Sequence, residues 1–233
     1  MVSKGIDRGK NNMTAARKII VINPNSNAGV TESMDMALEP FRFDSGPIIK
    51  SVTNSDGPSG IESQQDADCA AIQVVDMIKR RDEEADAFVI ACFSDPGIYG
   101  AREVTQKPVF GIAESGILTA LSLGNSFGIL AILDTSIPRH IRYIRSLGLE
   151  KRLAGDLAIG LGVAELSDDK KTFYRLQEVG KVLRDNRGAS VLILGCAGMA
   201  RYRQRLQESL EIPVVDPSQA AVSMAVSALL LDY

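Results

Sequence analysis

The chain has few of the residue types from which most metal centres and secreted scaffolds are built. It contains one histidine, His140, and three cysteines among 233 residues. A lone histidine argues against a histidine-based metal site and against a Ser-His triad, while an all-carboxylate site stays open. An odd number of cysteines without a short-spaced pair argues against a disulfide framework or a zinc ribbon. The sequence therefore predicts a reduced, cytoplasmic protein without a bound metal.

Excess charge and long apolar runs are also lacking. The net charge of −3 gives no reason to expect nucleic acid or an anionic membrane as a partner. No apolar run approaches the roughly 20 residues that cross a bilayer. Residues 1–16 are polar and basic and lack the apolar core of a secretory signal, so we expect a disordered N-terminal extension, with Met13 as an alternative start.

The remaining chain has enough apolar residues, 45% of the sequence, for a substantial core. Apolar runs of five to eight residues alternate with stretches of helical period, which predicts an α/β fold of parallel sheets covered by helices on both faces. The expected strands cover 18–23, 48–53, 87–92, 109–113, 127–133, 157–163, 190–196 and 214–216. The expected helices cover 31–38, 61–80, 97–105, 116–123, 137–147, 170–186, 199–210 and 218–230.

The order of these elements repeats. Each half contains an apolar run that ends in a cysteine, then a turn of small residues, a polar helical stretch and a Pro-Val that opens another strand. We therefore expect two pseudo-symmetric lobes with an active-site cleft between them. Lobe 1 is expected at 17–115, with the C-terminal helix at about 217–233 packing back on it, and lobe 2 at 116–216.

The two cysteines at matching positions are Cys92 and Cys196. Ligands of open parallel sheets gather at the carboxyl ends of the strands, where both thiols and the segment NPNSN (23–27) are expected. Each thiol precedes a helix start, whose free N–H groups favour anions and would lower a thiol pKa. Cysteine is also a common small hydrophobe, but a matched pair favours function. We interpret the third cysteine, Cys69, as a packing residue within a helix.

Two thiols that face one bound carbon are suited to inverting it. One removes a proton as general base, and the other returns a proton to the opposite side as general acid. N–H donors in the adjacent turns would stabilise the negative charge that develops on a neighbouring carbonyl. No cofactor is required when the carbon is already acidified by its substituents.

With these residues identified, the chain resembles the Asp/Glu/hydantoin racemase superfamily, and within it the hydantoin and allantoin racemase branch, from about Arg17 to Leu230. The motifs that carry the resemblance are INPNSN (22–27), GPSGIES (57–63), CFSDPGIYGARE (92–103), PVFGIAES (108–115), LGCAGM (194–199) and PVVDPSQAAV (213–222). The resemblance implies a cofactor-independent racemase of 5-substituted hydantoins or allantoin that uses Cys92 and Cys196. It implies a substrate site lined by Asn23, Pro24, Phe93, Ser94, Glu114, Ser115, Ala197 and Gly198. It also implies a homo-oligomer, a tetramer or hexamer.

Two alternative functions stay open beside this one: a different enzyme of the superfamily and a non-enzymatic binding protein. An aspartate or glutamate racemase or a maleate isomerase would need firm carboxylate anchoring, and the turns offer no clear dedicated arginine. A non-enzymatic small-molecule binding protein would use the same cleft.

Other polar residues have simpler interpretations. We interpret the basic segments RHIRYIR (139–145) and RYRQR (201–205) as solvated faces or subunit contacts, and His140 as a surface or helix-cap residue. We interpret Asp95 and Asp216 as helix caps.

Overall fold

The computed structural model describes residues 16–233, and apart from its last residue the expected extension at 1–16 lies outside them. The strands are β1 (Lys18–Asn23), β2 (Ile48–Thr53), β3 (Ala87–Ile90), β4 (Val109–Gly111), β5 (Phe127–Ala131), β6 (Leu153–Ala158), β7 (Val191–Leu194) and β8 (Val214–Val215). The helices are α1 (Ala28–Ala37), α2 (Gln64–Arg81), α3 (Ile98–Val104), α4 (Ile112–Leu123), α5 (Ile137–Ser146), α6 (Asp169–Lys181), α7 (Arg203–Leu210) and α8 (Pro217–Leu230).

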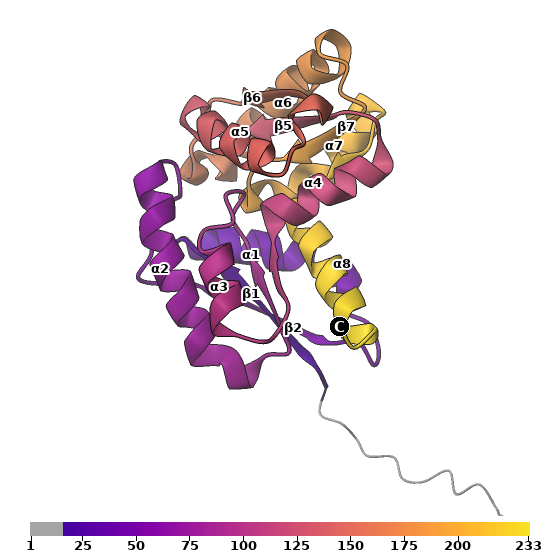
Figure 1. Ribbon diagram of the computed structural model, residues 1–233. Helices are drawn as coiled ribbons and strands as arrows, with labels where there is room; N and C mark the ends of the chain where they lie inside the picture. The colour runs from indigo at the N-terminus through magenta and orange to yellow at the C-terminus, as the bar shows by residue number, and fades with distance from the viewer. Residues whose placement is uncertain (1–15) are drawn as a thin grey trace, which may run out of the picture.

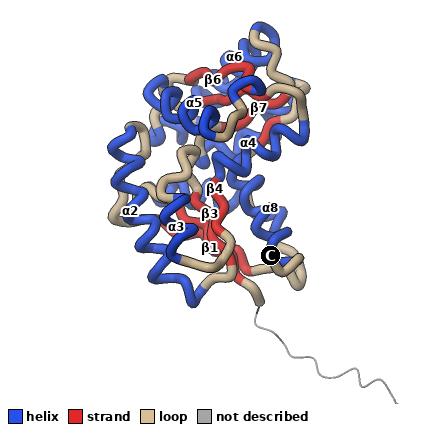
Figure 2. Tube along the Cα trace, in the orientation of Figure 1, coloured by secondary structure: helices blue, strands red, loops and turns tan. Residues whose placement is uncertain are grey.

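The strands form two four-stranded parallel sheets of the same topology, one in each lobe (Figure 2). The first sheet has the order β2-β1-β3-β4 and the second β6-β5-β7-β8. The predicted α/β fold of two pseudo-symmetric lobes is confirmed. Because all strands of a sheet run in one direction, the loops after their carboxyl ends gather at one edge.

Strand β1 illustrates why a continuous apolar run becomes a central strand. Ile19 and Val21 belong to one core cluster, and Ile20 and Ile22 belong to another. Successive side chains of a strand point to opposite faces, so both faces of β1 are covered, and all four side chains are fully buried. This arrangement explains why the strand was predicted at its observed bounds.

Strand β6 differs from the prediction, which put a strand at 157–163. The observed strand begins at Leu153 and includes Asp156, whose carboxylate is paired with His140 inside the protein. The apolar residues that suggested a strand follow its end and are buried: Ile159 and Leu161 lie in a loop, and Val163 begins a short 3₁₀ helix. The prediction was wrong because a buried charged residue interrupts the apolar pattern.

Two helices connect the lobes. Helix α4 follows β4 of the first sheet and packs against β7 of the second, so it spans the expected lobe boundary at 115/116. Helix α8 follows the second sheet but packs against β1, β3 and β4 of the first, as the yellow helix beside the lower lobe in Figure 1 shows. No described helix, α2 included, is long and apolar enough to cross a membrane.

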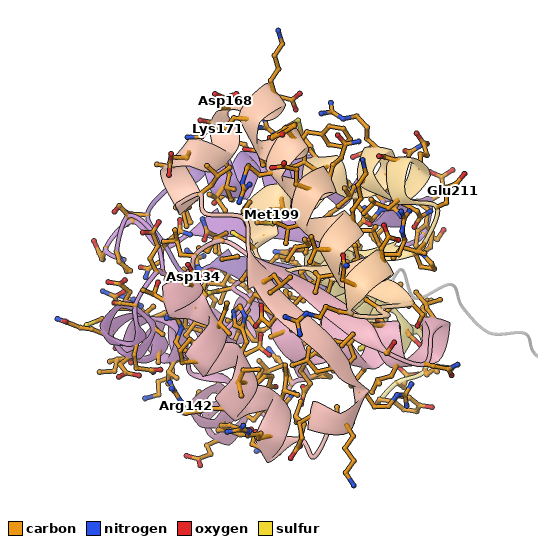
Figure 3. All side chains as sticks on the ribbon, turned by 90° about the horizontal axis from the view of Figure 1, so that it is seen from above. Asp134, Arg142, Asp168, Lys171, Met199 and Glu211 are labelled. Atoms are coloured by element: carbon orange, nitrogen blue, oxygen red, sulfur yellow. The ribbon has the colours of Figure 1, made fainter. Side chains whose placement is uncertain are left out.

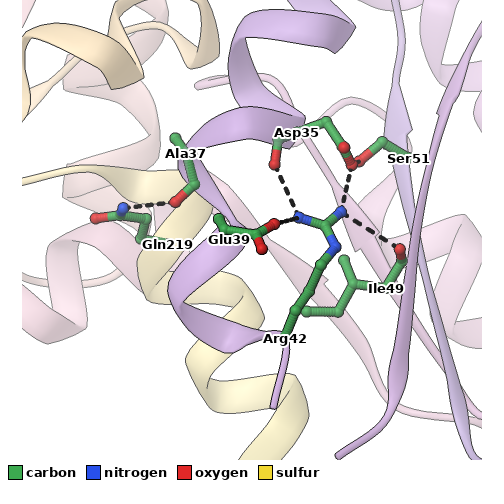
Figure 4. Close-up of polar contacts among 7 residues, drawn as sticks. All are labelled: Asp35, Ala37, Glu39, Arg42, Ile49, Ser51 and Gln219. Atoms are coloured by element: carbon green, nitrogen blue, oxygen red, sulfur yellow. Dashed lines mark hydrogen bonds and ion pairs between the residues drawn. The ribbon is translucent and has the colours of Figure 1, made fainter.

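Polar contacts fix α8 and the edge strand β2 to helix α1 (Figure 4). The side-chain amide of Gln219, in the first turn of α8, donates to the carbonyl of Ala37 at 2.7 Å. Arg42 donates to the carboxylate of Asp35 at 2.7 Å and to the carbonyl of Ile49 in β2 at 3.5 Å. Helix α1 is thereby tied both to its own lobe and to the last helix of the chain.

Candidate active site

Cys92 lies just beyond the carboxyl end of β3, at the start of a tight turn that leads into α3. The N–H of Asp95 donates to the carbonyl of Cys92 at 2.9 Å. Gly97 closes the turn with a φ of 78°, and a Cβ at this position would lie 2.6 Å from the carbonyl oxygen of Ala71. Only glycine satisfies both conditions, and it lets the turn after Cys92 end against the backbone of α2, where α3 begins.

Cys196 occupies the matching place in the second lobe. It follows β7 by one residue, Gly195, and precedes a short 3₁₀ helix that spans Ala197–Tyr202. A Cβ on Gly195 would lie 2.6 Å from the carbonyl oxygen of Leu130 in the neighbouring strand β5. The glycine therefore allows the backbone to pass close to β5 and brings the thiol to the cleft edge of the sheet.

Both thiols line one pocket between the lobes, with an empty volume of about 400 Å³ including its mouth. In each lobe, the residues that line the pocket come from the loops and helix starts after the first three strands in chain order. The first lobe supplies Asn25, Val30, Ile61, Ala91, Cys92, Phe93 and Ser94, and the second supplies Ile132, Ser136, Arg139, His140, Val163, Gly195, Cys196 and Ala197. Both cysteines are free thiols and half-buried.

The environment of the thiols keeps them protonated. Burial, together with the neighbouring Cys196 and Asp95, raises the pKa of Cys92 to about 12, against the N–H of Ser94 and the charge of Arg139. Burial likewise raises the pKa of Cys196 to about 11, against the N–H of Gly198. The expectation of a lowered thiol pKa is wrong for this pocket. The expected N–H donors are present, but loss of solvation outweighs them.

The NPNSN segment reaches the pocket through Asn25 rather than Asn23. Asn23 is fully buried and donates to Asn25 Oδ1 at 3.1 Å, to the carbonyl of Asn27 at 3.1 Å and to Thr31 Oγ1 at 3.0 Å. The N–H of Asn25 donates back to Asn23 Oδ1 at 3.2 Å. Asn23 thus fixes the position of Asn25. Pro24 is buried beside them, with its carbonyl accepting from the amide of Asn54.

Of the other predicted substrate-contact residues, some line the pocket and some do not. Phe93, Ser94 and Ala197 line the pocket. Glu114, Ser115 and Gly198 are not among its lining residues: the carboxylate of Glu114 pairs with Arg102 at 2.5 Å, and Ser115 is buried in α4. Gly198 lies beside Cys196, with its N–H directed at the thiol, and borders a separate cavity near α1.

Asp95 and Asp216 cap helices, as predicted, although Asp95 caps α4 rather than its own helix. The carboxylate of Asp95 accepts from the N–H groups of Ala113 and Glu114 at 2.8 and 2.9 Å. Asp216 is the N-cap of α8 and accepts from the N–H of Gln219 at 2.7 Å. Burial raises the pKa of Asp95 to about 7 and that of Asp216 to about 6.

A model of the family described as Asp/Glu/hydantoin racemase matches residues 19–225, which is most of the chain. The chain belongs to this racemase family. A hydantoin racemase of Paenarthrobacter aurescens is 35% identical over 220 residues, which cover 93% of this chain and 92% of that protein. An allantoin racemase from Klebsiella pneumoniae has a TM-score of 0.86 and 32% identity, over 93% of this chain and 89% of that one. An allantoin racemase from Pseudomonas fluorescens has a TM-score of 0.88 and 29% identity, over 92% of each chain.

This racemase-family pocket contains polar residues that the sequence analysis missed, chiefly Asn25, Ser136, Arg139 and His140. The interpretation of RHIRYIR as a solvated face is wrong for its first two residues, since Arg139 and His140 are 8% and 4% exposed. Pro138 in the first turn of α5 marked a helix start after β5, and that position is the signal that could have placed both residues at the cleft.

His140 is a buried residue of this racemase-family pocket rather than a surface or capping histidine. Its Nδ1 lies 2.8 Å from Asp156 Oδ2, and its ring meets Phe93 edge-on at a centroid distance of 5.1 Å. The interpretation of Cys69 as a packing residue is also wrong, because its thiol is exposed on α2. Among residues 16–233, no three histidine, cysteine or acidic side chains gather in a way that could hold a metal ion.

Proposed function

We propose that this chain racemises 5-substituted hydantoins, allantoin among them, by proton transfer at C5 between Cys92 and Cys196 without a cofactor. The single observation that carries the proposal is that thiols from opposite lobes, at matching places in two sheets of the same topology, line one pocket. The hydantoin and allantoin racemases to which the chain is similar support the choice of substrate.

The proposed reaction needs one thiolate and one thiol. The thiolate removes the C5 proton, so a C–H bond breaks, an S–H bond forms and the negative charge passes to the adjacent carbonyl as an enolate. The second thiol then donates its proton to the other face of C5 and becomes the thiolate. Proton exchange with solvent restores the starting form. The same pair works in the opposite direction with the roles exchanged.

The predicted substrate residues take different parts in this proposal. Phe93, Ser94 and Ala197 contact the substrate, since they line the pocket beside the thiols. Asn23 acts through Asn25, and Gly198 acts through its N–H on Cys196. Pro24, Glu114 and Ser115 make no direct contact with the substrate in this proposal, because they are not among the residues that line the pocket.

The test follows deuterium at C5. A single-enantiomer hydantoin is incubated with the enzyme in heavy water, and optical rotation and deuterium content are measured together. We expect rotation to decay with uptake of one deuterium at C5. Cys92→Ala and Cys196→Ala should each lower racemisation by at least about 100-fold, the usual contribution of a positioned acid or base. The matched control is Cys69→Ala, which removes the exposed thiol of α2 and leaves the rate unchanged.

Two results would contradict the proposal. Wild-type enzyme that leaves the rotation unchanged across a broad hydantoin and allantoin panel refutes the substrate class. Full turnover by either folded active-site variant refutes the two-thiol mechanism. Binding of a hydantoin without any deuterium uptake would instead identify a small-molecule binding protein.

An amino-acid racemase or maleate isomerase is the second candidate, and one observation favours it. Arg139 is a buried cation that lines the pocket, and a carboxylate substrate needs such an anchor. Assays with aspartate, glutamate and maleate discriminate between the candidates. Turnover of these acids without turnover of hydantoins would replace the first proposal.

We also propose that the chain works as a homo-oligomer in a reducing, cytoplasmic compartment. The resemblance to the family supports assembly, and the free thiols of the pocket support a reducing setting. Light scattering on purified protein measures the mass in solution. A monomer at working concentration would reject the oligomer.

A further inference from the structure

Arg139, near the start of α5, is a buried guanidinium without a charged partner. Its Nη1 donates to the carbonyls of Glu62 and Thr135 at 3.3 and 3.1 Å, and its Nη2 donates to Ser136 Oγ at 3.4 Å. All three acceptors are neutral. None of the ion pairs found among residues 16–233 includes Arg139, and its buried Nε has no hydrogen-bond partner.

A cation in this state is costly to a folded protein. Taking a charge out of water without a counter-ion destabilises the fold, so a buried cation that forms no ion pair is a cost that a role in function would explain. Arg139 lines the same pocket as Cys92, and its guanidinium and the thiol are close enough to affect each other's ionisation. The pocket therefore holds a fixed positive charge beside a group that becomes negative when it loses its proton.

Within the described part of the chain, none of the other charged groups around the pair forms an ion pair with Arg139. Cys92 also faces Cys196 and Asp95, both of which oppose a negative charge on its sulfur. Arg139 also faces Arg142, another cation, and the carboxylate of Asp66, which accepts hydrogen bonds from the N–H groups of Glu62 and Ser63.

Two further titratable residues of α5, His140 and Arg142, lie near Arg139 in sequence. His140, on the same helix, is already paired with the buried Asp156. Arg142, in the middle of α5 and labelled in Figure 3, is exposed, and its guanidinium donates to Gln64 of α2. Arg139 is thus the buried cation that faces Cys92, whereas Cys196 faces the carboxylates of Asp216 and Glu62.

We propose that Arg139 is a positioning residue that stabilises the thiolate form of Cys92. The inference rests on the proposed function for the use of that thiolate, but the ionisation itself occurs without substrate. Without Arg139, only the N–H of Ser94 opposes the effects of burial, Cys196 and Asp95 on the thiol, so Cys92 ionises at a still higher pH. The hydrogen bonds from Arg139 to Glu62, Thr135 and Ser136 hold the guanidinium in the pocket for this purpose.

The experiment measures alkylation of Cys92 by iodoacetamide in substrate-free protein between pH 8 and 10. Peptide mass spectrometry follows each cysteine separately, with exposed Cys69 as the internal reference. An opposite charge at close range changes a pKa by about one unit or more. Arg139→Met should therefore slow alkylation of Cys92 about tenfold at a fixed pH, because the reactive thiolate becomes scarcer.

Two further variants separate charge from structure. Arg139→Lys keeps the positive charge but loses the forked hydrogen bonds, so it should stay within about threefold of wild type in Cys92 alkylation. Arg142→Gln removes a neighbouring exposed cation and should leave the Cys92 profile in place. If Arg139→Met does not fold, Arg139→Gln takes its place, because it retains a hydrogen-bond donor and lacks the charge.

Unchanged or faster alkylation of Cys92 in Arg139→Met overturns the inference, as does an equal slowing in the Met and Lys variants, which would indicate a structural role. An unchanged profile combined with a raised KM for aspartate or glutamate identifies Arg139 as a carboxylate anchor instead. A shifted profile in a protein whose wild type racemises no hydantoin supports the inference and refutes the proposed function.

Discussion

The pH dependence of racemisation follows directly from the burial of the two thiols. The proposed reaction needs one thiolate, and the pKa of Cys196 is about 11 while that of Cys92 is about 12. The pair titrates as a coupled unit, so its first ionisation governs the free enzyme. With that ionisation near pH 11, only about one molecule in a thousand carries a thiolate at pH 8.

The direction of the effect is set by these raised pKa values. The thiolate is lost as the pH falls, so kcat/KM should rise about tenfold for each pH unit from 7 to 10, because kcat/KM reports the ionisation of the free enzyme. Polarimetry on a single-enantiomer hydantoin measures the rate, with the uncatalysed rate subtracted at each pH. The titration of the substrate's own N–H groups is recorded separately by absorbance.

A flat profile between pH 7 and 10 would refute the reasoning, because it would require a thiolate that is already formed at neutral pH. A maximum near neutrality would refute it equally. Cys69→Ser serves as the control and should reproduce the wild-type slope, since its thiol lies outside the pocket.

Two further predictions concern the framework of the pocket. Gly195→Ala forces a methyl group against the carbonyl of Leu130, which should destabilise the protein by about 1–3 kcal/mol in chemical denaturation and lower racemisation by displacing the thiol turn. Gly100→Ala, within helix α3, is the control: its methyl group would meet a side-chain carbon of Val75 at 3.3 Å rather than a backbone oxygen at 2.6 Å, so it should cost less stability and leave racemisation unchanged. Asn23→Ala removes four side-chain hydrogen bonds and should cost about 1–3 kcal/mol and raise KM, whereas the exposed Asn125→Ala should change neither. A fully stable, fully active Asn23→Ala would contradict the role given to this amide.

Much of the fold was predictable because local pattern and tertiary environment agree along the central strands. The apolar run of β1 gave its bounds directly, since it is a central strand of a sheet covered by helices on both faces. The edge strand β2 was also predicted at its observed bounds, although Ile49 is the one buried residue in it. The run at 157–163 misled because Asp156, a strand residue, looked like a loop residue. Asp156 is buried against His140 in α5, and the local sequence around Asp156 does not show that such a partner exists.

The two cysteines of the site were predictable because the same motif surrounds both. The helix start at Pro138 could have placed Arg139 near the cleft, but its burial could not be read from the local pattern. Its guanidinium donates to the carbonyl of Glu62, which is 77 residues away in sequence and lies in the other lobe. The pKa of the thiols likewise depends on how completely both lobes exclude water, which the helix-start motifs beside them do not encode.

The path of helix α8 determines when the protein can complete its folding during synthesis. The first sheet needs Val222, Ala225 and Leu229 of α8 in the core cluster that contains Ile19 and Val21. The part of that face that α8 covers therefore stays open to solvent while the ribosome translates the whole second lobe, although Val30 and Met34 of α1 already cover another part. The N-terminal strands are made first but are completely covered only when α8 emerges from the exit tunnel.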